Sequence, residues 1–297
     1  MKRLSHLDWL EYEAIEILRQ GVAEADRPVL LFSGGKDSTV LGHLAVKAFY
    51  PSRPPLPLLH IDSTWEFREV LDFRTRFAAE HGFELVIHHN EEGRRQALDP
   101  IRQGSLYTTV MRTEALKQAL DFGGYDVIFG GARRDEEATR AKERIVSVRD
   151  RNHGWDPKRQ RPEMWALYNW RRGPDETLRA FPLSNWTELD LWHYILRERI
   201  EVCPLYFAGE RPVTAVGDAH IVVDDAERAA GLGLGPVRSL RVRFRSLGCW
   251  PVTAALRSDA DDVASILRET LASRFSERRG RTGDGGSLEA QKRDGYF

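Results

Sequence analysis

The sequence contains little cysteine, no long apolar run and almost no net charge. Its 297 residues include two cysteines, Cys203 and Cys249, too few for a disulfide scaffold or a cysteine-rich zinc site. It lacks a run of about 18 apolar residues and the apolar stretch of a signal peptide, so we expect a soluble cytoplasmic protein with no membrane partner. The 44 Lys and Arg residues nearly balance 45 Asp and Glu residues, which argues against a broad basic surface for nucleic acid.

Apolar residues in the first half of the chain alternate between the patterns of buried strands and of amphipathic helices. Short apolar runs such as residues 29–32 are typical of strands buried on both faces. Repeated strand–helix units favour a parallel sheet covered by helices on both sides, so we predict an α/β fold. The predicted strands are 29–32, 58–61, 84–87 and 127–129, and the predicted helices are 5–25, 38–49, 66–81 and 109–122.

The pattern changes after Gly131. Residues 131–172 carry twelve Lys and Arg against seven Asp and Glu, and their apolar residues show no sustained period, so we predict partly irregular loops. Beyond them we predict a helix over 188–199, strands near 220–224 and 240–245, and a helix over 259–273. We expect two domains: an α/β domain of residues 1–200, and a smaller α+β extension of residues 201–297 with an Arg-rich tail.

The hexapeptide Ser33-Gly34-Gly35-Lys36-Asp37-Ser38 has the composition of a phosphate-binding loop and stands between a predicted strand and a predicted helix. Its glycines permit backbone conformations that turn successive N–H groups toward one anion, and the helix N-terminus adds unpaired donors. The two serine hydroxyls and the lysine charge suit phosphate oxygens. The aspartate suits a Mg²⁺ ligand or an anchor for the loop.

The spacing of this loop excludes a Walker A motif. That motif needs glycine where Leu30 stands, and Ser or Thr where Asp37 stands. An ordinary strand–helix turn also uses Gly and Ser. The strand–turn–helix context favours phosphate binding over such a turn.

The loop resembles the PP-loop of ATP pyrophosphatases, enzymes that cleave ATP between its α- and β-phosphates. Other segments are similar to the small, ATP-handling subunit of bacterial sulfate adenylyltransferase, in the same order over nearly the whole chain. These segments are 60–65 (His-Ile-Asp-Ser-Thr-Trp), 130–137, 140–144, 181–188, 247–251 (Leu-Gly-Cys-Trp-Pro) and 294–297. The chain departs from that family's pattern at Gly34, usually a bulky aliphatic residue, at Thr64, usually glycine, and at Ala138, usually lysine.

This resemblance implies a Rossmann-like PP-loop (adenine nucleotide alpha hydrolase) fold and a nucleotidyltransferase. Its expected reaction converts ATP and sulfate into adenosine 5′-phosphosulfate and pyrophosphate, the first step of sulfate activation. Mg²⁺ is the expected cofactor. A GTPase large subunit, whose GTP hydrolysis drives the reaction, is the expected partner, bound through residues 150–172 or the C-terminal region.

The resemblance also implies roles for individual residues. Lys36, Arg133 and Arg134 are the expected catalytic residues, and Asp37 the Mg²⁺ ligand. Guanidinium groups match tetrahedral oxyanions, so four arginines are expected to bind sulfate or phosphate: Arg133, Arg134, Arg140 and Arg245. The residues expected to contact ATP or pyrophosphate are Ser33, Gly34, Gly35, Lys36, Asp37, Ser38, Asp62 and Gly131.

Other interpretations of these residues stay open. Composition alone favours a solvated helix face for the arginines of 133–144, paired with nearby glutamates, although their place after a strand favours a site. A PP-loop sulfonucleotide reductase needs a reactive cysteine in its C-terminal tail, and residues 274–297 contain none. A non-catalytic subunit that senses ATP would keep the loop, and sulfate-dependent pyrophosphate release would separate it from the enzyme.

Overall fold

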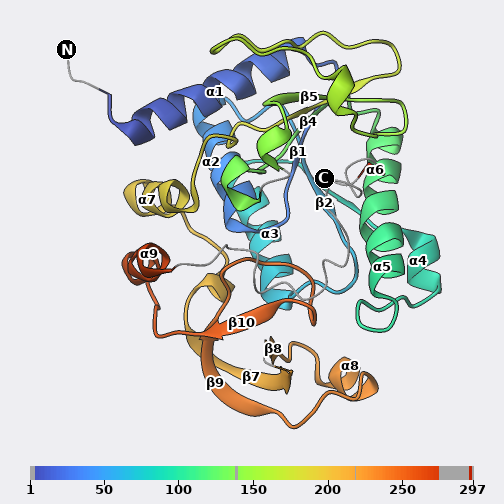
Figure 1. Cartoon of the computed structure of the whole chain (residues 1–297), viewed down its shortest axis with the longest axis vertical. Helices are drawn as coiled ribbons and strands as arrows, with labels where there is room; N and C mark the ends of the chain where they lie inside the picture. Colours follow the sequence, from blue (N-terminus) through green and yellow to red (C-terminus); the bar gives the residue numbers. More distant parts are fainter. Residues whose placement is uncertain (1–3, 138–139, 218, 274–293, 296–297) are drawn as a thin grey trace.

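The computed structural model describes residues 4–137, 140–217, 219–273 and 294–295. Its centre is a six-stranded sheet in the order β3-β2-β1-β4-β6-β5 (Figure 1). The strands are β1 (Pro28–Leu31), β2 (Leu58–Ile61), β3 (Leu85–His88), β4 (Val127–Phe129), β5 (Val146–Arg149) and β6 (Thr177–Ala180). Together with the helices described below, this mostly parallel sheet confirms the predicted α/β fold.

The four predicted strands run parallel, as expected; a fifth parallel strand, β6, was not predicted, and β5 is the exception in direction. It pairs antiparallel with β6, and it lies in the stretch that we predicted to be irregular. The prediction was wrong because Ser147 and Arg149 interrupt the apolar pattern of a buried strand. Both are buried, since Arg149 pairs with Glu143 and the Ser147 hydroxyl donates to Gln160. Internal partners therefore replace the water that these polar groups would otherwise need.

Helices cover both faces of the sheet. α1 (His6–Glu24), α2 (Lys36–Phe49) and α3 (Arg68–His81) lie on one face, and α6 (Ala115–Gly123) lies on the other (Figure 1). α1 begins at a capping box, in which the Ser5 hydroxyl accepts from the Asp8 N–H and the Asp8 carboxylate accepts from the Ser5 N–H. α6 packs Leu116 and Leu120 against the central strands. The carboxyl ends of the parallel strands thus meet at one edge, where ligands of such folds bind.

The segment predicted as one helix over 109–122 is interrupted. The helical stretch begins earlier, with α5 (Gly104–Thr108), and the predicted range itself consists of a π-helical turn η1 (Thr109–Glu114) followed by α6. Such turns are rare in proteins, and those that occur are often found at functional sites. The remaining short elements of the first half are α4 (Glu91–Arg95) and the 3₁₀ turns η2 (Arg134–Glu136), η3 (Arg140–Lys142) and η4 (Pro157–Arg159).

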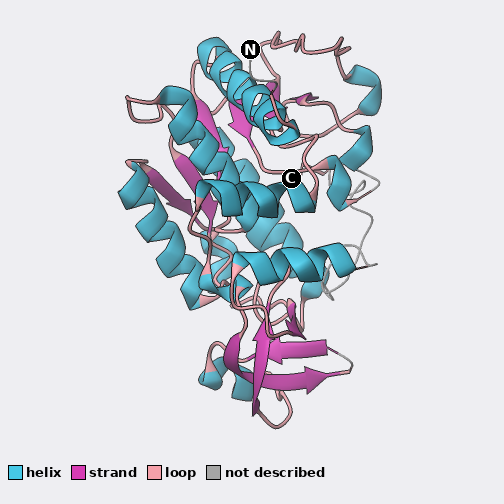
Figure 2. Cartoon of the chain, turned by 90° about the vertical axis from the view of Figure 1, so that its left-hand side faces the viewer, coloured by secondary structure: helices cyan, strands magenta, loops and turns pink. Residues whose placement is uncertain are grey.

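The chain after α7 (Glu188–Glu198) forms a smaller closed sheet (Figure 2). The turn η5 (Pro204–Tyr206) leads into β7 (Gly209–Val216), β8 (Ala219–Val222), β9 (Arg238–Arg243) and β10 (Ala254–Arg257), in the order β10-β8-β7-β9. α8 (Ala226–Gly231) follows β8, and α9 (Val263–Ala272) packs against α7. The predictions near 220–224 and 240–245 correspond to β8 and β9. β7 and β10 were missed because small and charged residues break their apolar alternation.

Two features of the sequence lie outside the described residues: Ala138, and the Arg-rich stretch 274–293. Within the part of the chain that the structure describes, no helix combines the length and apolarity needed to cross a bilayer.

Gly21 of α1 is required by close packing. A Cβ added there would lie 2.6 Å from Cζ of Phe129 and 2.7 Å from Cη2 of Trp170. We expect Gly21→Ala to lower the free energy of unfolding by about 1–3 kcal/mol, because two rigid rings would have to shift. Urea denaturation would measure the change. Gly104→Ala is the matched control, since nothing lies within 4 Å of its added Cβ; equal destabilisation by both variants would contradict the packing argument.

Candidate functional site

A cavity of about 290 Å³ lies where β1, β2 and β4 end. Its volume is near the lower limit of small-molecule sites, which is roughly 300 Å³. The loop after β1 forms one wall, and segments after β2, β4 and β9 form the others. Leu31, Leu59, Ile61 and Leu116 supply an apolar part, and the polar part includes Ser33, Asp37, Ser38, His60, Ser63, Glu66, Arg112, Glu136, Arg140 and Tyr206. The cavity therefore offers both apolar and polar groups to a ligand.

The loop after β1 has the geometry of an anion site. Gly34 has φ +74°, in the left-handed region that favours glycine. Gly35 is the N-cap residue, without a side-chain cap, and α2 begins at Lys36. The N–H groups of the first turn of a helix have no carbonyl partner within that helix. With the Ser33 and Ser38 hydroxyls 3.3 Å apart beside them, they form a place for phosphate oxygens.

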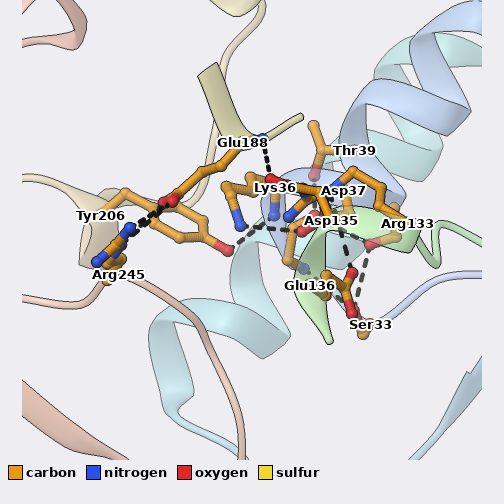
Figure 3. Close-up of polar contacts among 12 residues, drawn as sticks. Ser33, Lys36, Asp37, Thr39, Arg133, Asp135, Glu136, Glu188, Tyr206 and Arg245 are labelled. Carbon is orange, nitrogen blue, oxygen red and sulfur yellow. Dashed lines mark hydrogen bonds and ion pairs between the residues drawn. The ribbon is translucent and has the colours of Figure 1, made fainter. Parts of the chain in front are cut away.

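Asp37 is held between two buried cations (Figure 3). Its Oδ1 accepts from Nε of Arg133 at 2.6 Å, and its Oδ2 accepts from Nζ of Lys36 at 3.1 Å. Burial alone would raise the pKa of Asp37, but the charges of Lys36 and Arg133 outweigh it and hold that pKa well below its usual range. Asp37 is therefore an anchor that joins the start of α2 to the segment after β4.

Gly131 lets the segment after β4 lie directly against this loop. A Cβ added to Gly131 would lie 3.0 Å from the Asp37 carbonyl carbon and 3.2 Å from the Ser38 nitrogen. Any larger residue would push the two segments apart. Gly131 also lines the cavity.

The structure separates the four predicted arginines. Arg140 lines the cavity, with its Nε 3.1 Å from a carboxylate oxygen of Glu136. Arg133 is buried beneath the loop and pairs with Asp37. Arg134 lies outside the cavity lining and donates to Asn185 at 2.6 Å. Arg245 also lies outside that lining and pairs with Glu188 at 2.6 Å (Figure 3). Of the four, only Arg140 lines the cavity.

Asp62 and Thr64 shape the segment after β2. Oδ1 of Asp62 accepts from the Thr64 N–H at 2.9 Å. Asp62 is not among the residues that line the cavity, whereas the next residue, Ser63, is. Thr64 has φ 70°, an outlier for a β-branched residue. The backbone at position 64 thus has a conformation that glycine adopts easily. The hydrogen bond from its N–H to Asp62 holds the threonine in this conformation.

Sequence reasoning missed a second polar group at the cavity. Arg112 of the π-helical turn donates to Sγ of Cys249 at 2.6 Å, and the Ser63 and Tyr107 hydroxyls lie 3.0 and 3.1 Å from the same sulfur. Cys249 and Arg112 both line the cavity. The cysteine motif was visible in the sequence, but its partners are 137 to 186 positions away, so only the fold brings them together.

His60 is a neutral, buried side chain at the cavity. Its Nδ1 lies 2.8 Å from the Phe32 carbonyl, which can only accept, so Nδ1 carries the proton. Its Nε2 has no hydrogen-bond partner among the residues that the structure describes. Burial lowers the pKa of His60 to about 4, and the charge of Arg74 acts in the same direction, against the raising effects of the carbonyl and Asp62.

Comparison with known proteins finds relatives that cover nearly the whole chain. Residues 27–255 match the family described as the phosphoadenosine phosphosulfate reductase domain. Sulfate adenylyltransferase subunit 2 1 of Alkalilimnicola ehrlichii is 57% identical over 297 residues, covering 99% of this chain and 94% of that protein. Sulfate adenylyltransferase subunit 2 of Citrifermentans bemidjiense is 55% identical, covering 99% of both chains. The protein of the same name from Xanthomonas euvesicatoria is 56% identical, covering 99% of this chain and 98% of that protein.

The protonation state of His60 makes the free energy of unfolding depend on pH. The pKa of His60 in the folded protein, about 4, lies below the ordinary 6.5. The stability that the neutral side chain contributes is therefore complete above pH 6.5 and is lost as the pH falls toward 4. We expect His60→Asn to reduce the loss of unfolding free energy between pH 7 and pH 4.5 by about 2 kcal/mol. The pKa of His43 is also lowered to about 4. Because His43 is present in both the wild-type protein and the variant, its pH effect is the same in both and cancels in the comparison. Denaturant titrations at the two pH values would measure this. The same loss of unfolding free energy in the wild-type protein and in the variant would contradict the assignment.

Proposed function

Because the chain belongs to the sulfate adenylyltransferase subunit 2 family, we propose that this cavity transfers the adenylyl group of ATP to sulfate. The chain is a nucleotidyltransferase by family, and the products of the proposed reaction are adenosine 5′-phosphosulfate and pyrophosphate. The observation that carries the proposal is the juxtaposition, in one cavity, of a phosphate loop at the start of α2 and the guanidinium of Arg140. The two groups offer separate positions for two anions.

The chemistry asks for positioning and charge rather than for a general base. Sulfate is a dianion and needs no deprotonation to attack the α-phosphorus. The site must hold two anions in line and stabilise the negative charge that develops on the departing pyrophosphate. The first-turn N–H groups of α2 and the Ser33 and Ser38 hydroxyls are suited to pyrophosphate. Arg140 is suited to sulfate or to the α-phosphate, because its planar fork can donate two parallel hydrogen bonds.

Lys36 and Arg133 act through Asp37 in this proposal. Both cations neutralise a carboxylate that would otherwise repel the phosphates, and Arg133 also fixes the loop against the segment after β4. The residues that the structure describes include no group of three or more His, Cys, Asp or Glu side chains that could hold a metal. Asp37, with each oxygen already paired to a cation, does not fit the role of a Mg²⁺ ligand. Mg²⁺ is instead expected to enter as the counter-ion of the ATP phosphates.

The proposal includes a partner. The relatives are named as subunit 2 of an enzyme, which implies a complex of more than one subunit. The phosphosulfate anhydride is a high-energy product, so the forward reaction needs coupling to a second reaction. We propose that a GTPase large subunit supplies it, since this sequence has no Walker A loop at its phosphate site.

Reductase chemistry is disfavoured by the cysteines. Both Cys203 and Cys249 are buried, and none lies in residues 274–297. Burial raises the pKa of Cys203 to about 12, which leaves it a poor nucleophile at neutral pH. A thiol that attacks sulfur would have to be mobile and ionised.

The test is pyrophosphate release from ATP by the purified protein with its partner subunit and GTP. We expect release only when sulfate is present. Release at the same rate without sulfate, or no release from the complete complex, would overturn the proposal, and the second result would favour an ATP-sensing subunit.

The two arginines Arg140 and Arg134 provide a sharper test within the site. We expect Arg140→Gln to lower kcat/KM for sulfate by about 100-fold, because it removes a charged donor from the cavity. Arg134→Gln is the matched control and should change kcat/KM by less than about threefold, because its guanidinium contacts Asn185 outside the cavity lining. Steady-state kinetics at saturating ATP would measure both. A larger effect of the Arg134 variant would show that the oxyanion sits elsewhere.

A further inference from the structure

We propose that the Tyr206 hydroxyl is part of the pyrophosphate site, contributed by the segment between α7 and the smaller sheet. This inference rests on the proposed function and adds a positioning residue to it. The phosphate loop, which lies between β1 and α2, would then be completed by a residue 170 positions further along the chain.

Tyr206 meets the loop at the point where an anion would bind. Its hydroxyl oxygen accepts from the Lys36 N–H at 2.8 Å (Figure 3). Lys36 is the first residue of α2, so this N–H has no carbonyl partner within the helix, and the hydroxyl that accepts from it stands beside the other first-turn donors. A Cβ added to Gly35 would lie 3.4 Å from the same hydroxyl oxygen. Tyr206 also lines the cavity, together with Ser33, Gly35 and Ser38.

The position of the hydroxyl is fixed by packing. The Tyr206 side chain is buried, and its ring meets that of Trp192 edge to face, with centroids 5.5 Å apart. Its N–H donates to the Cys203 carbonyl at 3.1 Å within the η5 turn. Moving the hydroxyl aside would open this aromatic contact in the core. We therefore expect the hydroxyl to stay in place when an anion enters the loop.

The chemistry of a phenol suits this position. A tyrosine hydroxyl both accepts and donates, so the group that accepts from Lys36 can also donate to a phosphate oxygen. Accepting a hydrogen bond strengthens a hydroxyl as a donor, because each bond polarises the next. The phenol is neutral and adds no negative charge that would repel an anion. The arrangement favours an anion with several oxygens that binds beside the contact between the loop and the hydroxyl, within reach of both.

Tyr206→Phe tests this role, because it keeps the ring and removes only the hydroxyl. We expect the variant, titrated with pyrophosphate alone in a calorimeter, to bind about tenfold more weakly than the wild-type protein. In steady-state assays its KM for ATP should rise while its KM for sulfate stays unchanged. A structural role alone would shift the melting temperature without separating these two constants.

Tyr194→Phe is the matched control, since Tyr194 is also a buried tyrosine, and its hydroxyl contacts Lys47 of α2 rather than the loop. It should leave pyrophosphate affinity within twofold of the wild type. Unchanged or tighter binding by the Tyr206 variant would overturn the inference and leave the proposed function standing. A wild-type protein that binds no pyrophosphate would instead overturn the proposed function, and this inference with it.

Discussion

The site depends on one buried carboxylate. Asp37 joins the first turn of α2 to the segment after β4 through Lys36 and Arg133, whose side chains are themselves buried. Buried charges persist only when they are paired, and removing one partner leaves another charge uncompensated in the interior. The Asp37–Arg133 pair therefore holds the phosphate loop against the segment of Gly131 and Arg140, and the Lys36–Asp37 pair balances charge within the loop. The residues that look most like phosphate ligands serve first to hold the loop.

The same interaction extends toward the C-terminal part of the chain. Arg133 also contacts Asp135 at 3.5 Å, and Asp135 accepts from the N–H of Glu188, the first residue of α7. Glu188 in turn pairs with Arg245, which follows β9. A continuous set of polar contacts thus links the loop, α7 and the end of β9 (Figure 3). The loop is held from both parts of the molecule, and Arg245 acts in this support rather than at the cavity.

Much of this fold could be predicted, because the central strands are apolar runs between helices with clear periodicity. The place of the glycine-rich loop was predictable for the same reason: Gly34 and Gly35 stand between a buried strand and a helix. β5 was not predictable, since its Arg149 and Ser147 are satisfied by side chains that only the fold supplies. For the same reason the sequence could not separate Arg140 from Arg134, nor bring Tyr206 and Arg112 to the cavity. Local sequence patterns predict the helices and strands, whereas the partners of buried polar groups lie far away in the sequence.

The central claim is that one cavity binds ATP and sulfate so that the bond between the α- and β-phosphates breaks reversibly. Exchange of labelled pyrophosphate into ATP measures this most directly, because exchange requires that bond to break and re-form at the enzyme. The account predicts exchange by the assembled enzyme that depends on sulfate and disappears when sulfate is omitted. Exchange that proceeds equally without sulfate, or none at all in its presence, would contradict it.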